Sequence, residues 1–343
     1  MASFTKTEIQ EATGASVAVS GEKTLFSGVE TDTRVIGRDA LFVALKGERF
    51  DGHDFVGKAV QQGAAGVIVS EMRDEYREYG IAVFVADDTL KAYQALARFH
   101  RRRFSIPVVA VTGSVGKTST RNMIASVLSQ KYDVLQTEKN FNNEIGLPRT
   151  LLQLTERHEA CVVEMGMRGL GQIAELAAIA EPTIGVVTNV GKSHIELLGS
   201  QENIAKAKSE LVLALDEKGT AVLNADDSFV APMAALCRGS VLTYGTEAGD
   251  DIWAEQIAVS EQGVTFTCHC GSDVFAAQIP AISRHHAYNG LAAAAVGCLT
   301  GLSAEEIRRG LAAYKGVPMR EELISLAPYT FINDAYNANP ASM

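Results

Sequence analysis

Short apolar runs in the first part of the chain end in polar residues and alternate with one amphipathic stretch. The apolar runs, rich in Val, Ile and Phe, predict strands at 40–45, 66–70 and 81–85. Between the first two runs, the pattern at 54–63 predicts a helix. Residues 1–86 are therefore predicted to form a small α/β unit. A longer helical pattern over 89–103 is interpreted as a connector to the next unit.

From Pro107 onward, the chain repeats a rhythm of strand, loop and helix. Strand-like runs begin at residues 107, 159, 183, 219 and 240, and helical patterns begin at 117, 170 and 201. Apolar β-branched runs separated by helices predict a parallel sheet that is covered on both faces. Residues 251–279 predict antiparallel strands, and 284–312 predict two helices. The expected class is α/β, with a central parallel-sheet domain over residues 87–313.

Composition narrows the class of partner. The chain has 343 residues, of which 47% are hydrophobic and 21% charged, so a large core and two or three domains are expected. Its net charge of −10 excludes a general basic surface, and no nucleic-acid partner is expected. No apolar run approaches the roughly 18 residues of a membrane-spanning helix, so no membrane partner is expected either. A monomer is the default expectation.

The N-terminus and the cysteines bear on the compartment. Residues 1–14 lack the apolar core of a secretion signal and predict a short helix. Five cysteines are too few for a disulfide scaffold, and Cys161 and Cys298 are predicted to be core residues because they lie in apolar stretches. Cys268 and Cys270 flank a histidine in a strand-like run without further ligands at useful spacing, so no metal site is predicted there. A reducing cytoplasm is the expected location.

A glycine-rich loop joins the strand at 107–112 to the helix that begins at residue 117. The loop residues are Gly113, Ser114, Val115, Gly116, Lys117, Thr118 and Ser119. Glycines let the backbone approach phosphates, and the N–H groups and helix dipole favour an anion. Lys117 adds a positive charge, and Thr118 could place its hydroxyl on Mg²⁺. Val111 stands where the usual pattern has a glycine, so this is a shortened P-loop; the alternative is an ordinary glycine-rich turn.

Further candidates follow the strands, because open parallel sheets bind ligands at the carboxyl ends of their strands. Glu164 ends an apolar strand, where a carboxylate beside a phosphate loop is a natural Mg²⁺ ligand. His194 follows the next strand, although a lone loop histidine is usually structural. The helix with Lys206, Lys208 and Glu210 could be a solvated face. The cluster Asn140, Asn142 and Asn143 either satisfies a turn or binds polar ligand groups.

These segments occur together in one order. The segments are VTGSVGKTST, KNFNNEIGLPRTLL, VVEMGMRGLGQI, TNVGKSHIELLGS, IAKAKSEL, RHHAYNGLAAAA and NDAYNANPASM. Together they resemble the Mur ligase family, and the likeness extends through residues 32–69 to essentially the whole chain. The resemblance implies ATP-dependent amide formation through an acyl phosphate. KNFNNEIGLP and YNANP favour the member that joins D-alanyl-D-alanine to UDP-N-acetylmuramoyl-tripeptide. Another Mur-type ligase, or a nucleotide-binding module without turnover, stays open as an alternative.

The resemblance also implies residue roles. The loop from Gly113 to Ser119 would bind the phosphates of ATP. Thr118 and Glu164 would bind one Mg²⁺, His194 would bind a second, and Lys208 matches a lysine that the family carbamylates with CO₂. The implied catalytic residues are Lys117, Glu164, His194 and Lys208. Further implied ATP contacts are Asn289, Arg320, Asp334, Tyr336 and Asn337. The UDP-substrate contacts would be Thr31, Asp32, Thr33 and Arg34, with Asn142 and Asn143 near the phosphates or the muramoyl-peptide.

Three positions depart from the family pattern, and the resemblance also bears on the domain count. Met319 and Ser283 stand where glycines are expected, and His286 doubles a histidine. The resemblance implies a UDP-muramoyl-peptide-binding domain over 1–86, an ATP-binding domain over 87–313, and a third domain of roughly a hundred residues. Residues 314–343 would be a truncated stub of that third α/β domain, ending in a strand without a partner. Low or absent ligase activity is therefore expected.

Overall fold

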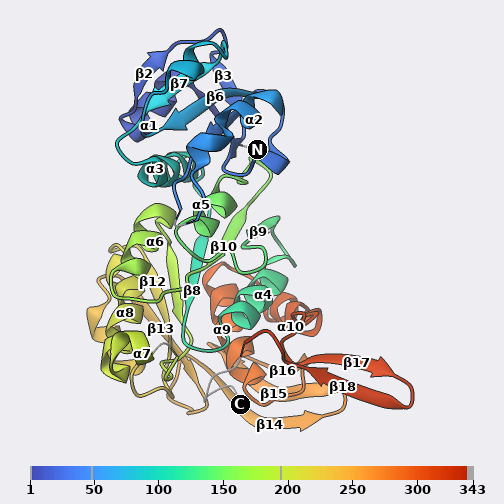
Figure 1. Ribbon diagram of the computed structural model, residues 1–343. Helices are drawn as coiled ribbons and strands as arrows, with labels where there is room; N and C mark the ends of the chain where they lie inside the picture. Colours follow the sequence, from blue (N-terminus) through green and yellow to red (C-terminus); the bar gives the residue numbers. More distant parts are fainter. Residues whose placement is uncertain (1, 48, 194, 338–343) are drawn as a thin grey trace. The chain divides into compact units, whose positions relative to one another are not determined.

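The computed structural model describes residues 2–47, 49–193 and 195–337, which form two compact units (Figure 1). Unit 1 comprises Met1–Ser105 and Glu144–Glu156, and unit 2 comprises Ile106–Asn143 and Arg157–Met343. The first boundary therefore falls after Ser105 and not after residue 86, and residues 314–343 group with unit 2.

The helix that was interpreted as a connector belongs to unit 1. This helix, α3 (Thr89–Arg101), packs against α1 (Lys6–Thr13) and α5 (Gly146–Leu151). The Gln94 side chain donates a hydrogen bond to the Glu144 carbonyl at 3.1 Å. These contacts explain why the boundary lies later than the sequence pattern predicted.

Unit 1 is built on a five-stranded sheet with the order β2-β7-β6-β5-β4. The strands are β2 (Ser16–Val19), β4 (Val29–Glu30), β5 (Ala40–Val43), β6 (Ala64–Val69) and β7 (Ala82–Val85). The strands from β4 to β7 are parallel, and β2 is antiparallel to β7. A small ribbon of β1 (Ser3–Thr5) and β3 (Leu25–Ser27), with α2 (Val56–Gln61), completes the unit. The three strands and the helices predicted in this region are confirmed.

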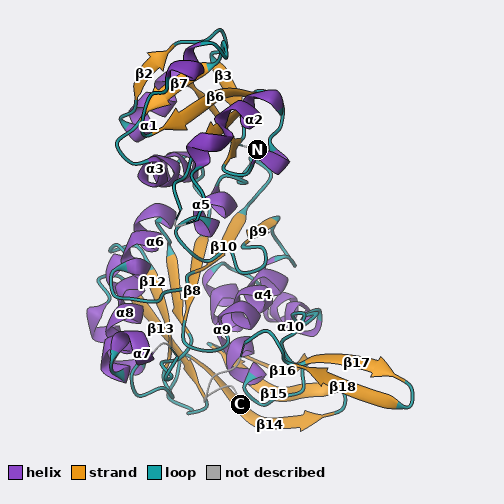
Figure 2. Cartoon of the chain, viewed as in Figure 1, coloured by secondary structure: helices purple, strands orange, loops and turns teal. Residues whose placement is uncertain are grey.

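Unit 2 contains a nine-stranded sheet with the order β16-β15-β14-β13-β12-β11-β8-β10-β9 (Figure 2). Its strands are β8 (Val108–Thr112), β9 (Val134–Gln136), β10 (Ala160–Glu164), β11 (Ile184–Val187), β12 (Thr220–Asn224), β13 (Ser240–Gly245), β14 (Ile252–Ser260), β15 (Gly263–Cys270) and β16 (Asp273–Ile279). Pairing is parallel from β9 to β14 and antiparallel from β14 to β16. The predicted parallel sheet and its antiparallel extension are confirmed.

Helices cover both faces of this sheet. On one face α4 (Lys117–Leu128), α9 (His286–Leu299) and α10 (Ala304–Ala312) pack together, and on the other lie α6 (Gln172–Ala180) and α8 (Gln201–Ala214) (Figure 1). A short helix, α7 (Ile195–Leu198), precedes α8. Buried Val109, Val162 and Val186 form the floor of the core beneath α4 and α9. Among the described residues, no helix is both long and apolar enough to cross a membrane.

One expectation about the later part of the chain is wrong, and one cysteine that packs against the core as expected has a partner that was not expected. The strand in the closing segment, β18 (Tyr329–Asn333), has an antiparallel partner, β17 (Glu322–Leu326), which the sequence pattern did not predict. Both faces of this hairpin carry exposed apolar side chains, including Phe331 and Ile332. Cys298 of α9 is joined to Cys270 of β15 in a disulfide, because α9 packs on β15. Cys161 is a buried free thiol, as expected.

Candidate active site

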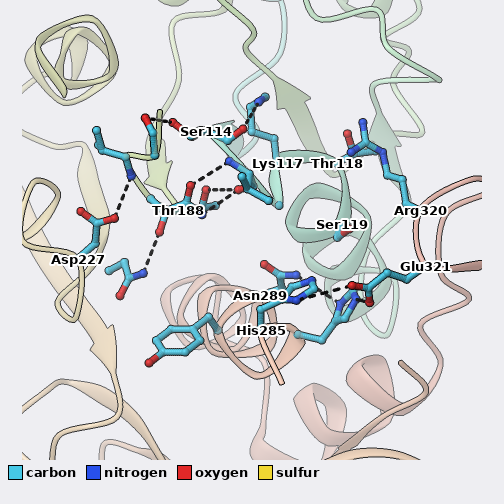
Figure 3. Close-up of a pocket in the computed structure, with 18 of the residues that line it drawn as sticks. Ser114, Lys117, Thr118, Ser119, Thr188, Asp227, His285, Asn289, Arg320 and Glu321 are labelled. Carbon is cyan, nitrogen blue, oxygen red and sulfur yellow. Dashed lines mark hydrogen bonds and ion pairs between the residues drawn. The ribbon is translucent and has the colours of Figure 1, made fainter. Parts of the chain in front are cut away.

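A cavity of about 510 Å³ lies in unit 2 at the carboxyl ends of β8, β11 and β12 (Figure 3). Its walls come from several segments: the loop 114–119, the turn 188–191 after β11, residues 224–227 at the end of β12, Tyr244 of β13, the start of α9, and residues between 320 and 337. Ligands of open α/β sheets bind at this edge, where the strands present backbone and side-chain donors. The position of the cavity therefore agrees with the loops that the sequence pattern singled out.

Two glycines shape the loop at the cavity floor. Gly116 has a φ of 81°, and a Cβ atom there would lie 3.0 Å from the Asn289 side-chain oxygen. A Cβ atom at Gly113 would collide with the Thr188 hydroxyl. Only glycine suits either place, because one requires left-handed backbone and both require close approach. The loop therefore turns tightly into the N-terminus of α4.

The loop is held by residues that follow β11. The N–H of Val115 donates to Asn189 Oδ1 at 2.9 Å, and its carbonyl accepts from Asn189 Nδ2 and Thr188 Oγ1, each at 2.9 Å. Three bonds to one loop residue fix its backbone before any ligand arrives. A backbone fixed in this way, at the positive end of the helix dipole, suits a phosphate group.

Lys117 begins α4 and lies back over the loop. Its amine donates to the carbonyl of Gly113 at 2.9 Å and lies 3.4 Å from that of Ser114. Burial lowers the pKa of Lys117; the nearby Glu164 charge opposes this shift, and the Arg320 charge adds to it. An anion bound at the loop would stabilise the charged form of the Lys117 amine, because its negative charge would offset the positive charges of Lys117 and Arg320.

Glu164 ends β10 and is buried beside the loop. Its Oε2 accepts from the Thr118 hydroxyl at 2.9 Å and lies 3.4 Å from the Arg121 guanidinium, while its Oε1 accepts from Asn142 Nδ2 at 2.8 Å. Thr118 and Glu164 thus bring together hard oxygen donors of the kind that Mg²⁺ prefers. Sequence reasoning missed Arg121, whose only signal is its place one turn after Lys117 on the same helix.

Lys208 and Lys206 lie in different environments on α8. Lys208 is buried, and no carboxylate partner of its amine is recorded among the described residues, whereas Lys206 is exposed. Burial lowers the pKa of Lys208 well below its ordinary value, and the charge of Lys117 lowers it further. Glu210, two residues on, accepts from the N–H groups of Gly171 and Ala174 at 2.6 and 3.0 Å. Lys208 is therefore the buried lysine of the two, and the charge of Lys117 at the loop acts on its amine.

Most of the other expected ATP contacts border the same cavity. Arg320, Asp334, Asn337 and Asn289 line it. The Arg320 guanidinium lies 4.2 Å from the centre of the Tyr336 ring, which places this tyrosine behind the arginine. The fourth expected catalytic residue, His194, lies outside the described residues.

The residues expected to bind the UDP-substrate lie in unit 1, apart from two asparagines. Asp32 accepts from the Arg34 N–H at 2.9 Å and pairs with its guanidinium, and these bonds lower the pKa of Asp32 to about 2. Thr31 and Thr33 flank this exposed pair. In unit 2, Asn142 bonds to Glu164 as described, and Asn143 is exposed.

Comparison with known proteins decides the family. The family model of the Mur ligase middle domain matches residues 111–297, and the family model of the Mur ligase catalytic domain matches residues 25–101. A Bacillus subtilis protein named UDP-N-acetylmuramoyl-tripeptide--D-alanyl-D-alanine ligase is 42% identical over 323 residues, which are 94% of this chain and 69% of that protein. The chain belongs to the Mur ligase family.

Solved Mur ligases share the fold. A crystal structure of MurF from Acinetobacter baumannii aligns with a TM-score of 0.94 and 32% identity, over 100% of this chain and 75% of that one. MurF from Thermotoga maritima in complex with ADP aligns with a TM-score of 0.81 and 29% identity, over 92% and 72%. The predicted α/β Mur ligase architecture is confirmed.

Several cavity residues were not predicted. Asp226 accepts from the Tyr288 hydroxyl at 2.8 Å, and Asp227 accepts from the Val190 N–H at 2.9 Å. Both aspartates directly follow β12, so the rule that ligands bind at the carboxyl ends of strands could have found them. Glu321 also lines the cavity, but it lies between elements and no sequence pattern marks it.

Proposed function

We propose that this Mur ligase uses ATP to join D-alanyl-D-alanine to UDP-N-acetylmuramoyl-tripeptide, a step of peptidoglycan precursor synthesis. One observation carries the proposal: Lys117 and the Thr118–Glu164 pair meet at the phosphate loop. The buried Lys208 supports it, because burial and the charge of Lys117 both lower the pKa of its amine. A module that only binds nucleotide has no need of a buried lysine with a lowered pKa.

The chemistry requires little more than positioning and charge. The terminal carboxylate of the tripeptide attacks the γ-phosphorus of ATP, the bond from that phosphorus to the β,γ-bridging oxygen breaks, and ADP leaves. The amine of D-alanyl-D-alanine then attacks the acyl carbon, loses a proton and expels phosphate. Both steps build negative charge near the phosphoryl group, which Lys117 and Arg320 are proposed to stabilise.

The residues at the loop fit Mg²⁺. The Thr118 hydroxyl donates to the Glu164 carboxylate at 2.9 Å, so two oxygen donors lie together beside the loop. When bound, Mg²⁺ would neutralise charge on the phosphate oxygens. We assign Thr118 and Glu164 to one ion, and His194 and Lys208 to a second.

Lys208 would act as a carbamate. An uncharged amine can attack CO₂ and lose a proton, which replaces a buried cation with an oxygen-rich anion able to ligate Mg²⁺. ¹³C NMR with labelled bicarbonate should therefore give a carbamate resonance that Lys208→Ala removes and that Lys206→Ala leaves in place. Retention of the resonance in Lys208→Ala would reject the assignment.

The remaining contacts complete the proposal. Asn289, Asp334, Tyr336 and Asn337 would hold the nucleoside end of ATP. Residues 31–34, with Asn142 and Asn143, would hold the UDP-substrate. The acidic net charge supports small-molecule partners and no nucleic acid. We expect a cytoplasmic monomer.

Product analysis tests the proposal. The protein is incubated with ATP, Mg²⁺ and UDP-N-acetylmuramoyl-tripeptide, and D-alanyl-D-alanine, L-alanine or D-glutamate is added in parallel. Any amide that mass spectrometry detects, at the low yield expected above, should form only with the dipeptide, with one ADP formed per amide. An amide with a different amine, or ADP formation that no UDP-muramoyl-peptide stimulates, would contradict the assignment.

A further inference from the structure

Three potential metal ligands meet where α9 begins. His285 and His286 lie at its N-terminus, and Glu321 reaches them from the segment between α10 and β17 (Figure 3). His286 Nε2 lies 3.3 Å from Glu321 Oε2, and His285 Nδ1 lies 3.9 Å from Glu321 Oε1. The ligand atoms lie within 4.8 Å of one another, and no other group of three such side chains was found among the described residues.

The backbone and neighbours of Glu321 fix its direction. Its φ is 49°, in the left-handed region that non-glycine residues rarely adopt. Its N–H donates to Asp334 Oδ1 at 3.3 Å, and its Oε1 accepts from the Ser283 hydroxyl at 2.9 Å. A strained conformation that several contacts hold in place is typical of a functional position. Ser283 and His286 are two of the positions that depart from the family pattern.

One oxygen of this carboxylate lacks a hydrogen bond. Glu321 Oε2 is buried and makes no hydrogen bond in the described part of the chain, although it faces the His286 ring. A buried carboxylate oxygen without a hydrogen bond carries a desolvation cost that a bound cation would remove. This oxygen lies 3.3 Å from His286 Nε2, while the other carboxylate oxygen lies 3.9 Å from His285 Nδ1.

We propose that His285, His286 and Glu321 form a binding site for a borderline divalent transition-metal cation of the Zn²⁺ type, open to the nucleotide cavity. Two imidazoles and one carboxylate favour zinc over Mg²⁺, which prefers oxygen ligands alone. All three residues line the cavity. The site is distinct from the Thr118–Glu164 pair and does not depend on ligase activity.

Small adjustments bring the ligands to zinc distances. Tetrahedral ligands at the usual zinc–nitrogen distance lie about 3.4 Å apart, so the widest spacing must shorten. The half-exposed His285 side chain has room to move. Asn289 Nδ2 lies 3.3 Å from His286 Nδ1, and a turn of this amide would let its oxygen accept a hydrogen bond from that nitrogen. The metal-facing Nε2 would then be free of its proton, with Asn289 orienting the ring.

An occupied site would join two walls of the cavity. One wall is the first turn of α9, which carries Asn289, and the other is the segment that carries Arg320 and Asp334. The cation would therefore hold the two groups of proposed ATP contacts at a fixed spacing.

Zinc titration tests the site directly. Calorimetry of ZnCl₂ into the metal-stripped full chain, without nucleotide or Mg²⁺, should give one site that His286→Asn and Glu321→Gln each weaken at least tenfold. His285→Ala should also weaken zinc binding at least tenfold. Because His285 is more exposed, this variant keeps the test decisive if a variant of a buried residue fails to fold. The matched control is His269→Asn, because His269 faces Glu255 at 3.1 Å in another histidine–glutamate pair.

Two outcomes would overturn the proposal. One is the absence of zinc binding to the wild-type protein. The other is zinc binding that the folded His286→Asn, Glu321→Gln and His285→Ala variants retain at wild-type affinity. Circular dichroism establishes folding, and visible absorption of the Co²⁺-loaded protein provides a second readout that the same variants should lose.

Discussion

Lys208 on α8 is a buried lysine whose amine has no counter-ion among the described residues, and such a residue is costly. Burying a polar group without a hydrogen bond costs about 1–3 kcal/mol in protein mutational data. Burial disfavours the charged amine of Lys208 and lowers its pKa, and the positive charge of Lys117 lowers it further. Selection for packing alone would not place it there, which makes its chemistry the best single-residue evidence for catalysis.

Replacing Lys208 should stabilise the fold while it abolishes the reaction. In CO₂-depleted buffer at pH 7, Lys208→Met should raise the free energy of unfolding by about 1–3 kcal/mol, because the unpaired amine is removed. The folded wild type binds fewer protons than the unfolded chain between the lowered pKa and the ordinary value of 10.5. Wild-type stability should therefore rise with pH in that window, and the variant should lack this contribution.

Urea denaturation of both proteins across that pH range provides the measurement. Exposed Lys206→Met is the matched control and should change stability little. A wild type and Lys208→Met with parallel pH profiles would contradict the buried, uncharged amine.

Lys117 should take up a proton when nucleotide binds. Its pKa is lowered in the free protein, and phosphate charges would raise it. In the pH range between the two values, binding of ADP should consume protons, and affinity should fall as pH rises. Calorimetry in buffers of different ionisation enthalpy measures the uptake. Lys117→Met should lose it, and equal uptake by this variant would exclude Lys117 as the source.

At the scale of elements, the site depends on how the strands end. The sequence pattern predicted α4 to begin at Lys117, and it does, because the glycine-rich loop stops β8 and the helix follows at once. It also predicted Glu164 beside that loop, since parallel β8 and β10 end at the same edge. The sequence pattern could not predict the contact between Glu321 and His285, because the two residues are 36 positions apart and Glu321 has a left-handed backbone conformation.

Alanine variants of two glycines at helix N-termini distinguish the effect of backbone strain from the effect of blocking the site. Gly116 and Gly171 precede α4 and α6 with φ of 81° and 84°, but a Cβ atom meets Asn289 only at Gly116. Either change to alanine should cost about 1–2 kcal/mol of stability, because alanine disfavours left-handed backbone. Only Gly116→Ala should also weaken ADP binding, by at least tenfold in calorimetry. Equal ADP affinities for the two variants would contradict the close approach at the loop.

At the scale of the whole molecule, the sequence pattern predicted an N-terminal α/β unit and a central parallel-sheet unit. It assigned α3 and residues 144–156 to the central unit, whereas they belong to unit 1. Helical periodicity indicates that a helix has an apolar face, but it does not indicate which element packs against that face. The sequence pattern also missed β17, which pairs with β18 in an antiparallel hairpin. The chain spans 69% of the Bacillus subtilis relative and 75% of the Acinetobacter baumannii chain.

The transfer of oxygen tests the central claim most directly. UDP-N-acetylmuramoyl-tripeptide with ¹⁸O in its terminal carboxylate is incubated with the protein, ATP, Mg²⁺ and D-alanyl-D-alanine, and the released phosphate is analysed by mass spectrometry. An acyl phosphate predicts that one carboxylate oxygen leaves with each phosphate, so each amide formed should release one ¹⁸O-labelled phosphate. Amide formation with unlabelled phosphate would contradict the account.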